Sequence, residues 1–261
     1  MSHLLEVKNL DVKFDTDEGQ ITAVENISLS VDEGEVLGIV GESGSGKSVT
    51  AKSIMQLNPG NTSYNENAEI ILDNENVLKF NSKEDLKKIR GGKVSMIFQE
   101  PMASFAPAIK IGSQMVEQLL IHKKINKDEA KSISVNMLKR VGIADAEKRF
   151  NQYAFELSGG MRQRAMIAMA LSTMPKLLLA DEPTTALDVT IQAQVINLIK
   201  DIIKEYQMGV IFITHDLGVI AQVADQVAVM YLGSIVEKGP VNEILKNPKH
   251  PYTKGLLQAL P

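Results

Sequence analysis

Two short glycine-rich segments of this chain contain the residue types that bind phosphate groups. The first covers residues 41–48 and reads GESGSGKS, which fits the pattern G-x-x-x-x-G-K-[ST]. In such a turn, backbone N–H groups surround the phosphates of a nucleotide. The candidate nucleotide-binding residues are therefore Gly41, Glu42, Ser43, Gly44, Ser45, Gly46, Lys47, Ser48 and the following Val49.

The second segment covers residues 157–164 and reads LSGGMRQR, at the start of an apolar-rich helical stretch. Its first four residues are Leu157, Ser158, Gly159 and Gly160. Unpaired N–H groups and the helix dipole at such a helix start also favour an anion. Because one nucleotide needs only one such cradle, the second segment suggests a role on a nucleotide that a neighbouring chain binds.

The first segment has the flanking elements that a phosphate loop requires. Val36 to Val40 is a short apolar run, which predicts a buried strand, and residues 48–57 can form a helix before Pro59 stops it. In this context Lys47 should reach the β- and γ-phosphates, and the Ser48 hydroxyl should contact Mg²⁺. The alternative, a glycine-rich turn with a surface lysine, has little support.

An acidic pair follows another apolar run, Leu177 to Ala180. A carboxylate at the carboxyl end of a parallel strand points into the crevice where ligands bind such sheets. Asp181 fits the magnesium role, and Glu182 is then placed to orient or deprotonate the attacking water. Without the phosphate loop, such a pair would more often be structural.

Two further polar residues follow predicted strands in the same way. His215 comes after residues 210–214 and has Asp216 beside it, so a hydrogen bond from its imidazole to a γ-phosphate or water is an option. Gln99 ends the strand predicted for residues 94–98 and could contact Mg²⁺ or water. By itself, Gln99 would be interpreted as structural.

The remaining pattern predicts strands that alternate with helices, which points to a parallel α/β core. From Pro101 to about Arg164 the sequence pattern becomes that of helices. A later helix is also expected, with its apolar positions at Ile191, Val195, Leu198 and Ile202. Further strands are expected at residues 4–14, 27–31, 68–72 and 227–231, and further helices at 82–90, 111–122 and 127–141.

Composition restricts the class of protein. The 261 residues carry a net charge of −4, which gives no electrostatic sign of nucleic-acid binding. The absence of cysteine excludes disulfides and thiolate metal sites. We see neither a signal peptide nor an apolar stretch long enough to cross a bilayer, so we expect a protein that works in water inside the cell.

Taken in order, these residues resemble the nucleotide-binding subunit of an ABC (ATP-binding cassette) transporter over nearly the whole chain. The resemblance makes Gln99 the glutamine loop, Leu157 to Gly160 the signature, Leu177 to Glu182 the Walker B strand and His215 the switch histidine. Asp188 corresponds to the D-loop, and Phe14 sits where the family places an aromatic ring against adenine. The cofactors implied are ATP and Mg²⁺.

The resemblance also implies a fold and a mode of assembly. The fold is the P-loop NTPase fold of ABC ATPases, with a RecA-like core, an antiparallel β subdomain and an inserted helical subdomain at about 101–164. Residues 1–261 would form a single nucleotide-binding domain with a family C-terminal motif at about 240–261. Two ATPase subunits pack head to tail in this family, so Ser158, Gly159 and Gly160 would act on the partner's nucleotide.

A narrower resemblance is to importers of oligopeptides, dipeptides and nickel, through NPKHPYTK at residues 247–254 and DEPTTALDVT at 181–190. It implies a first (D-type) ATPase paired with a second one, two membrane permeases and an extracytoplasmic binding protein, at the cytoplasmic face of the membrane. Phe105 and Ala106 differ from the residues usually found at these positions in the group, and they lie in a segment expected to face the permeases. Because these 261 residues contain no cysteine, we do not expect the cysteine-bearing extension that carries an iron–sulfur cluster in some relatives.

Other functions remain open at this stage. The same group also imports nickel and oligosaccharides, and the transported solute is not written in this chain. Soluble ABC ATPases of DNA repair or translation usually carry coiled-coil insertions or two cassettes, and this sequence shows neither. A P-loop kinase or nucleotide-binding regulator would have no use for the signature at residues 157–160.

Overall fold

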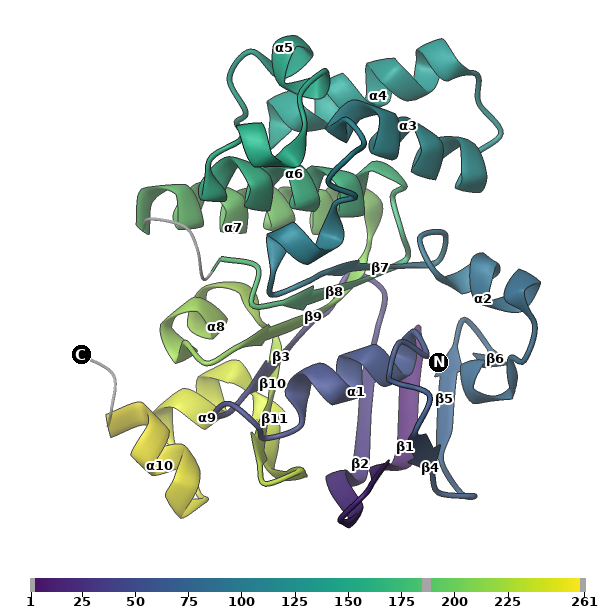
Figure 1. Ribbon diagram of the computed structural model, residues 1–261. Helices are drawn as coiled ribbons and strands as arrows, with labels where there is room; N and C mark the ends of the chain where they lie inside the picture. The colour runs from purple at the N-terminus through teal and green to yellow at the C-terminus, as the bar shows by residue number, and fades with distance from the viewer. Residues whose placement is uncertain (1–2, 185–188, 259–261) are drawn as a thin grey trace. The chain divides into compact units, whose positions relative to one another are not determined.

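The computed structural model describes residues 3–184 and 189–258, which form two compact units (Figure 1). Unit 1 joins Met1–Leu86 to Gln207–Pro261, and unit 2 is Lys87–Tyr206. The boundary between them falls inside helix α2 (Lys83–Ile89). The predicted helical subdomain at 101–164 therefore lies wholly within unit 2. Across the described residues, no helix combines the length and apolar character needed to cross a membrane.

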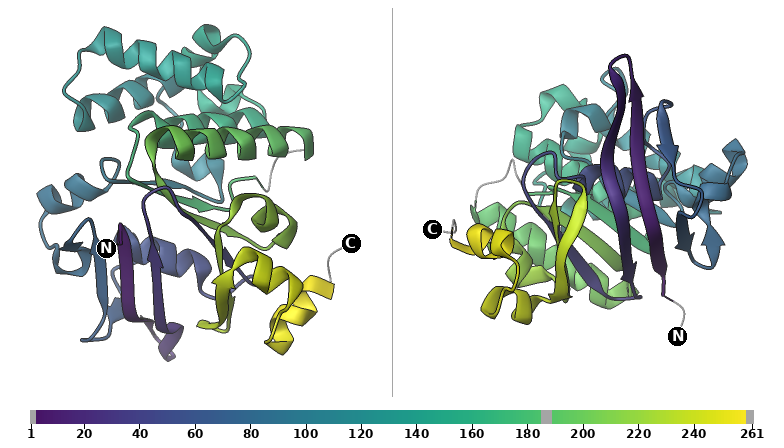
Figure 2. Two further views of the ribbon diagram at one scale, coloured as in Figure 1. Left: turned by 180° about the vertical axis from the view of Figure 1, so that it is seen from behind. Right: turned by 90° about the horizontal axis from the view of Figure 1, so that it is seen from below.

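Unit 1 contains an antiparallel sheet built on a long strand pair, β1 and β2, which stands out when the molecule is seen from below (Figure 2). Its strands are β1 (Leu5–Thr16), β2 (Gly19–Val31), β4 (Thr62–Tyr64), β5 (Glu69–Leu72) and β6 (Glu75–Asn76). The order is β2-β1-β5-β6, with β4 paired to β1. The sequence located β1 but only the last part of β2, because residues 19–23 are exposed or half-buried and lack a buried alternation.

The second sheet of unit 1 places β3 between two parallel neighbours. Its strands run in the order β11 (Ser234–Pro240), β10 (Gln226–Tyr231), β3 (Val36–Val40) and β9 (Gly209–Thr214). Every residue of β3 and β9 is buried, which explains why both read as uninterrupted apolar runs. The sequence did not reveal β11, because it pairs only with β10 and is half-buried and polar.

Short helices complete unit 1. They are α1 (Lys47–Ile54), α8 (Leu217–Val223), α9 (Val241–Lys246), α10 (Pro251–Gln258) and the single-turn η1 (Val77–Lys79). Helix α1 ends before the predicted Leu57, because Gln56 adopts a left-handed backbone with φ of 50°. Helices α9 and α10 follow β11 and form the yellow end of the chain in Figure 1.

Unit 2 combines one parallel strand pair with a group of helices. The strands are β7 (Val94–Ile97) and β8 (Leu177–Asp181), and Ile97 lies opposite Ala180. The helices are α3 (Ile111–His122), α4 (Lys127–Arg140), α5 (Ala146–Phe150), α6 (Gly159–Ser172) and α7 (Val189–Tyr206), with the single-turn helices η2 (Pro101–Ser104) and η3 (Ala154–Glu156). Helix α4 begins where predicted because Asn126 and Glu129 form a capping box.

The buried face of α7 differs from the one that the sequence predicted. Val195 and Ile202 are buried as expected, whereas Ile191 and Leu198 are only half-buried. The fully buried positions also include Ile196, Ile199 and Ile203. The predicted apolar face included only one residue per helical turn. A helix that packs on a core buries a wider face, so more than one residue per turn is buried.

Gly38 on β3 provides a test of this packing. A Cβ atom there would lie 2.8 Å from Cδ1 of Ile220 on α8 and 3.2 Å from Cβ of Ala224. We expect Gly38→Ala to lower the free energy of unfolding by about 1–3 kcal/mol, as overpacking does. Gly60→Ala is the matched control, because a Cβ atom at Gly60 meets nothing within 4 Å. Equal urea midpoints for the two variants would contradict the packing described.

Candidate functional site

The phosphate loop occupies residues 41–46, between the end of β3 and the start of α1. Gly44 and Gly46 have φ of 81° and 98°, a left-handed backbone that glycine adopts most easily. A Cβ atom at Gly46 would lie 2.7 Å from the Ala23 carbonyl oxygen, and one at Gly41 would overlap the carbonyl oxygen of Met230. Both glycines are therefore required by close contact with the backbone of β2 and β10.

Lys47 is held at the loop that it follows. Its side chain is 6% exposed, and its ammonium donates to the Gly41 and Glu42 carbonyl oxygens at 2.8 and 2.7 Å. The adjacent Ser48 is half-buried in the first turn of α1. A positive charge and a hydroxyl thus stand side by side where the glycine turn meets the helix.

His215 lies at the same sheet edge as the phosphate loop. Strands β3 and β9 are parallel, with Val40 opposite Thr214, so the loop and His215 both begin at a carboxyl end. The His215 side chain is exposed. The neighbouring Asp216 caps α8, because its Oδ1 accepts the N–H groups of Gly218 and Val219 at 2.7 and 3.2 Å.

Phe14 lies in the antiparallel sheet of unit 1. It is half-buried on β1, opposite Ile21 of β2 and Thr62 of β4. The structure gives its position, and its predicted contact with adenine stays a prediction.

The predicted acidic and amide residues of unit 2 meet at one edge of the β7–β8 pair. The Gln99 Nε2 donates to the Glu182 Oε2 at 3.2 Å. Asp181, the last residue of β8, is 3% exposed, whereas Glu182 is half-buried. Glu182 has φ of 48°, an unusual backbone for a non-glycine residue that often marks a functional position.

The signature segment forms the N-terminus of α6, as predicted. The Ser158 hydroxyl oxygen caps the helix by accepting the Met161 N–H at 3.3 Å. Ser158 and Gly159 are exposed, and a Cβ atom on Gly159 would meet nothing within 4 Å. Leu157 is buried and accepts from the Arg162 guanidinium at 2.9 Å. The glycine therefore leaves an open helix start rather than relieving an internal clash.

Gln163 lies in the second glycine-rich segment, but its sequence context gave it no role of its own. This residue of α6 is fully buried, and its Nε2 donates to the carbonyl oxygen of Pro183, the residue after Glu182. It thereby ties the signature helix to the segment that follows the acidic pair. The only sequence signal was an amide side chain entering the apolar run of α6.

Three other residues were singled out from the sequence. Asp188 lies outside the described residues. Phe105 is buried at 5% exposure, so its ring does not form part of the surface, whereas Ala106 is exposed and exchanges two backbone hydrogen bonds with the Gln114 side chain.

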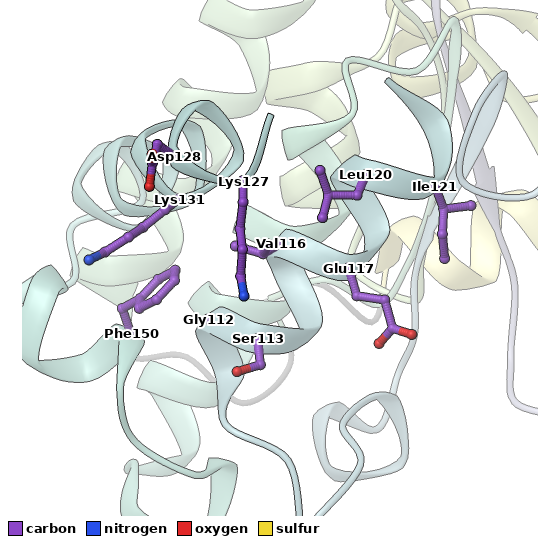
Figure 3. Close-up of a pocket in the computed structure, with 10 residues that line it drawn as sticks. All are labelled: Gly112, Ser113, Val116, Glu117, Leu120, Ile121, Lys127, Asp128, Lys131 and Phe150. Atoms are coloured by element: carbon purple, nitrogen blue, oxygen red, sulfur yellow. The ribbon is translucent and has the colours of Figure 1, made fainter. Parts of the chain in front are cut away.

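A cavity of about 510 Å³ lies among α3, α4 and the end of α5 (Figure 3). Val116, Leu120 and Phe150 give it an apolar wall, and Lys127 and Lys131 of α4 line its other side. None of the predicted site residues lines it, so it is separate from the nucleotide chemistry.

The oxygen donors predicted for magnesium fit that ion. Asp181 offers a carboxylate, Ser48 a hydroxyl and Gln99 an amide oxygen, and Mg²⁺ prefers oxygen ligands. Within the described part of the chain, no group of three or more His, Asp or Glu side chains could hold a metal by itself. Mg²⁺ is normally bound through one or two carboxylates together with substrate phosphates, so such a cluster is not required.

Comparison with known families decides how these motifs belong together. A family model described as "ABC transporter" matches residues 24–185, which is more than half of the chain. This chain belongs to the ABC transporter family. A second model, described as "Oligopeptide/dipeptide transporter, C-terminal region", matches residues 236–261. The predicted family and its narrower group are thus confirmed.

Curated relatives and solved structures agree. The chain is 52% identical, over its whole length and 73% of the relative, to the oligopeptide transport ATP-binding protein OppD of Bacillus subtilis. It is 50% identical, over 99% of its length and 74% of the relative, to the dipeptide transport ATP-binding protein DppD of Lactococcus lactis. The dimeric structure of MJ0796, a bacterial ABC transporter cassette, matches with a TM-score of 0.82 and 28% identity over 91% of this chain and 98% of that one. The predicted ABC ATPase fold is therefore confirmed.

Gly46 and Gly44 provide a matched test of the loop. Both have a left-handed backbone, but only Gly46 also faces a carbonyl oxygen at 2.7 Å from an added Cβ atom. We expect Gly44→Ala to cost about 1–2 kcal/mol of unfolding free energy from its backbone alone. Gly46→Ala should cost roughly 1–3 kcal/mol more, because the added atom also overpacks. Equal losses in chemical denaturation would show that the contact with Ala23 does not restrict the loop.

Proposed function

We propose that this chain is the ATP-binding and ATP-hydrolysing subunit of an importer that takes up oligopeptides or dipeptides. The observation that carries the proposal is one cassette that combines the phosphate loop, the strand-end acidic pair and the exposed signature with the matched C-terminal region at 236–261. The peptide substrate is inferred from relatives that are 52% and 50% identical.

Residues of the phosphate loop bind the nucleotide. The N–H groups of residues 44–48 and the Lys47 ammonium neutralise phosphate charge, and Phe14 contacts the adenine. The Lys47 ammonium already lies at the loop, so only a small movement takes it from the loop carbonyls to phosphate oxygens. Ser48, Gln99 and Asp181 would hold Mg²⁺, which would supply charge neutralisation at the transferring phosphate.

Glu182 and His215 act on the reaction itself. The Glu182 carboxylate orients the attacking water and accepts its proton, and its hydrogen bond to Gln99 at 3.2 Å fixes the direction of the carboxylate. The exposed imidazole of His215 donates a hydrogen bond to the γ-phosphate. Asp188 of the D-loop would take part in the contact with the partner subunit.

The signature serves a second cassette. Ser158, Gly159 and Gly160 present an uncluttered N-terminus of α6, a 14-residue helix whose dipole favours an anion. We propose that they contact the nucleotide of a different, related ATPase, so that two ATP molecules close the pair. Exclusion of water on closure completes the environment of the γ-phosphate.

The assembled importer contains this chain, a second ATPase, two membrane permeases and an extracytoplasmic binding protein. The ATPases bind peripherally at the cytoplasmic face of the membrane, and the permeases contact the region around Ala106. No nucleic acid is involved, in keeping with the net charge of −4. Nickel or oligosaccharide import is the alternative within the same family.

Replacement of one carboxylate tests the proposed chemistry. Glu182→Gln keeps the size of the side chain and removes the base, so we expect ATP hydrolysis to fall about 100-fold or more. The measurement is phosphate release by the assembled transporter in detergent. Glu33→Gln, in an exposed turn, is the control and should hydrolyse ATP at the wild-type rate. A wild-type rate for Glu182→Gln would rule out its role as the base.

A further inference from the structure

Helix α10 brings a side chain to the phosphate loop from the far end of the chain. The Glu42 N–H donates to the Tyr252 hydroxyl oxygen at 3.0 Å, across a sequence separation of 210 residues. Both residues belong to unit 1. Tyr252 also lies inside the matched oligopeptide/dipeptide C-terminal region, 236–261, for which the motifs of the cassette give no chemical role.

This hydrogen bond is made by the same peptide group that accepts a hydrogen bond from Lys47. The amide between Gly41 and Glu42 offers its N–H to Tyr252, and its carbonyl oxygen accepts from the Lys47 ammonium at 2.8 Å. The N–H and C=O of a planar trans peptide point in opposite directions, so fixing one aims the other. Tyr252 therefore sets the direction of the carbonyl that holds Lys47.

This part of the loop depends on support from outside. Glu42, Ser43 and Gly44 are all exposed, whereas Gly41, Ser45 and Gly46 are buried. The Gly233 N–H, in the turn between β10 and β11, supports the later half by donating to the Ser45 carbonyl oxygen at 3.2 Å. Tyr252 gives the exposed first half a comparable anchor.

Tyr252 is itself held in place. Its ring packs on Tyr231 at a centroid distance of 4.4 Å, and its N–H donates to the His250 Nδ1 at 3.2 Å. The Glu237 carboxylate on β11 accepts the N–H groups of Lys249 and His250 at 2.7 and 3.0 Å. The start of α10 is thus tied to the same sheet that carries the loop.

The protonation of these groups agrees with their roles. Burial raises the pKa of Tyr252 and outweighs the Glu42 N–H, which lowers it, so the hydroxyl stays neutral near pH 7. Burial alone would raise the pKa of Glu237. The backbone N–H groups of Lys249 and His250, which donate to the carboxylate, reverse this and keep that pKa below its ordinary value, so the carboxylate is charged.

We propose that Tyr252 is a positioning residue for the phosphate loop, and that the C-terminal region serves to hold the loop in its ATP-binding shape. The proposal rests on the ATPase function proposed above. A preorganised loop loses less conformational freedom when it binds the phosphates, so the bond to Tyr252 contributes to ATP affinity without touching the nucleotide.

The test removes one oxygen atom. Tyr252→Phe keeps the ring on Tyr231 but deletes the acceptor of the Glu42 N–H. The dissociation constant of a fluorescent ATP analogue should rise about threefold to tenfold, the range expected for one neutral hydrogen bond. In the assembled transporter, KM for ATP should rise by a similar factor while kcat stays unchanged. Tyr231→Phe removes the hydroxyl of the neighbouring ring and is the matched control.

A second variant perturbs the same contact by weakening the attachment of the start of α10 to β11. Glu237→Gln weakens the attachment of Lys249 and His250, and it should also raise the dissociation constant. Combined with Tyr252→Phe it should add little, because both changes release the same element. Full additivity of the two effects would contradict a shared action on the loop, as would a fall in kcat with KM unchanged.

The outcomes separate this inference from the proposed function. If wild-type protein binds the analogue, Lys47→Ala does not, and Tyr252→Phe binds as tightly as wild type, then Tyr252 does not position the loop and the ATPase proposal stands. If the wild-type protein itself fails to bind the analogue, the proposed function is wrong and the inference falls with it. A lower melting temperature for Tyr252→Phe with unchanged affinity would show a purely structural role and overturn the inference.

Discussion

A loop can surround an anion with backbone N–H groups only if no side chain occupies the inside of its turn. In this chain the constraint is strict, because Gly41 and Gly46 lie directly against the carbonyl oxygens of Met230 and Ala23. The shape of the loop therefore depends on β10 and β2 as well as on its own sequence. The fully buried β3 and the start of α1 fix its two ends.

Parallel strand register brings the predicted site residues to the carboxyl ends of the strands. In unit 1, β3 and β9 end together and present the phosphate loop and His215. In unit 2, β7 and β8 end together and bring Gln99 within hydrogen-bonding distance of Glu182. Loops at these edges can vary in sequence, while the strands that carry them must remain apolar.

Local signals in the sequence predicted much of this arrangement. The β3 strand, the loop, the acidic pair and the capped start of α6 all depend on neighbours in sequence, and all were located. The missing features depend on contacts between distant segments. Gln163 and Tyr252 lie in segments that the sequence singled out, but their contacts with Pro183 and Glu42 exist only in the folded chain.

We propose that this cassette works in a membrane importer together with a second, different ATPase. Mass spectrometry of proteins that copurify with the tagged chain from its own solubilised membranes tests this claim most directly. We expect to recover two permeases, a second ATPase and a binding protein that carries a bound peptide. Recovery of the chain alone, or with ribosomal proteins or nucleic acid, would contradict it.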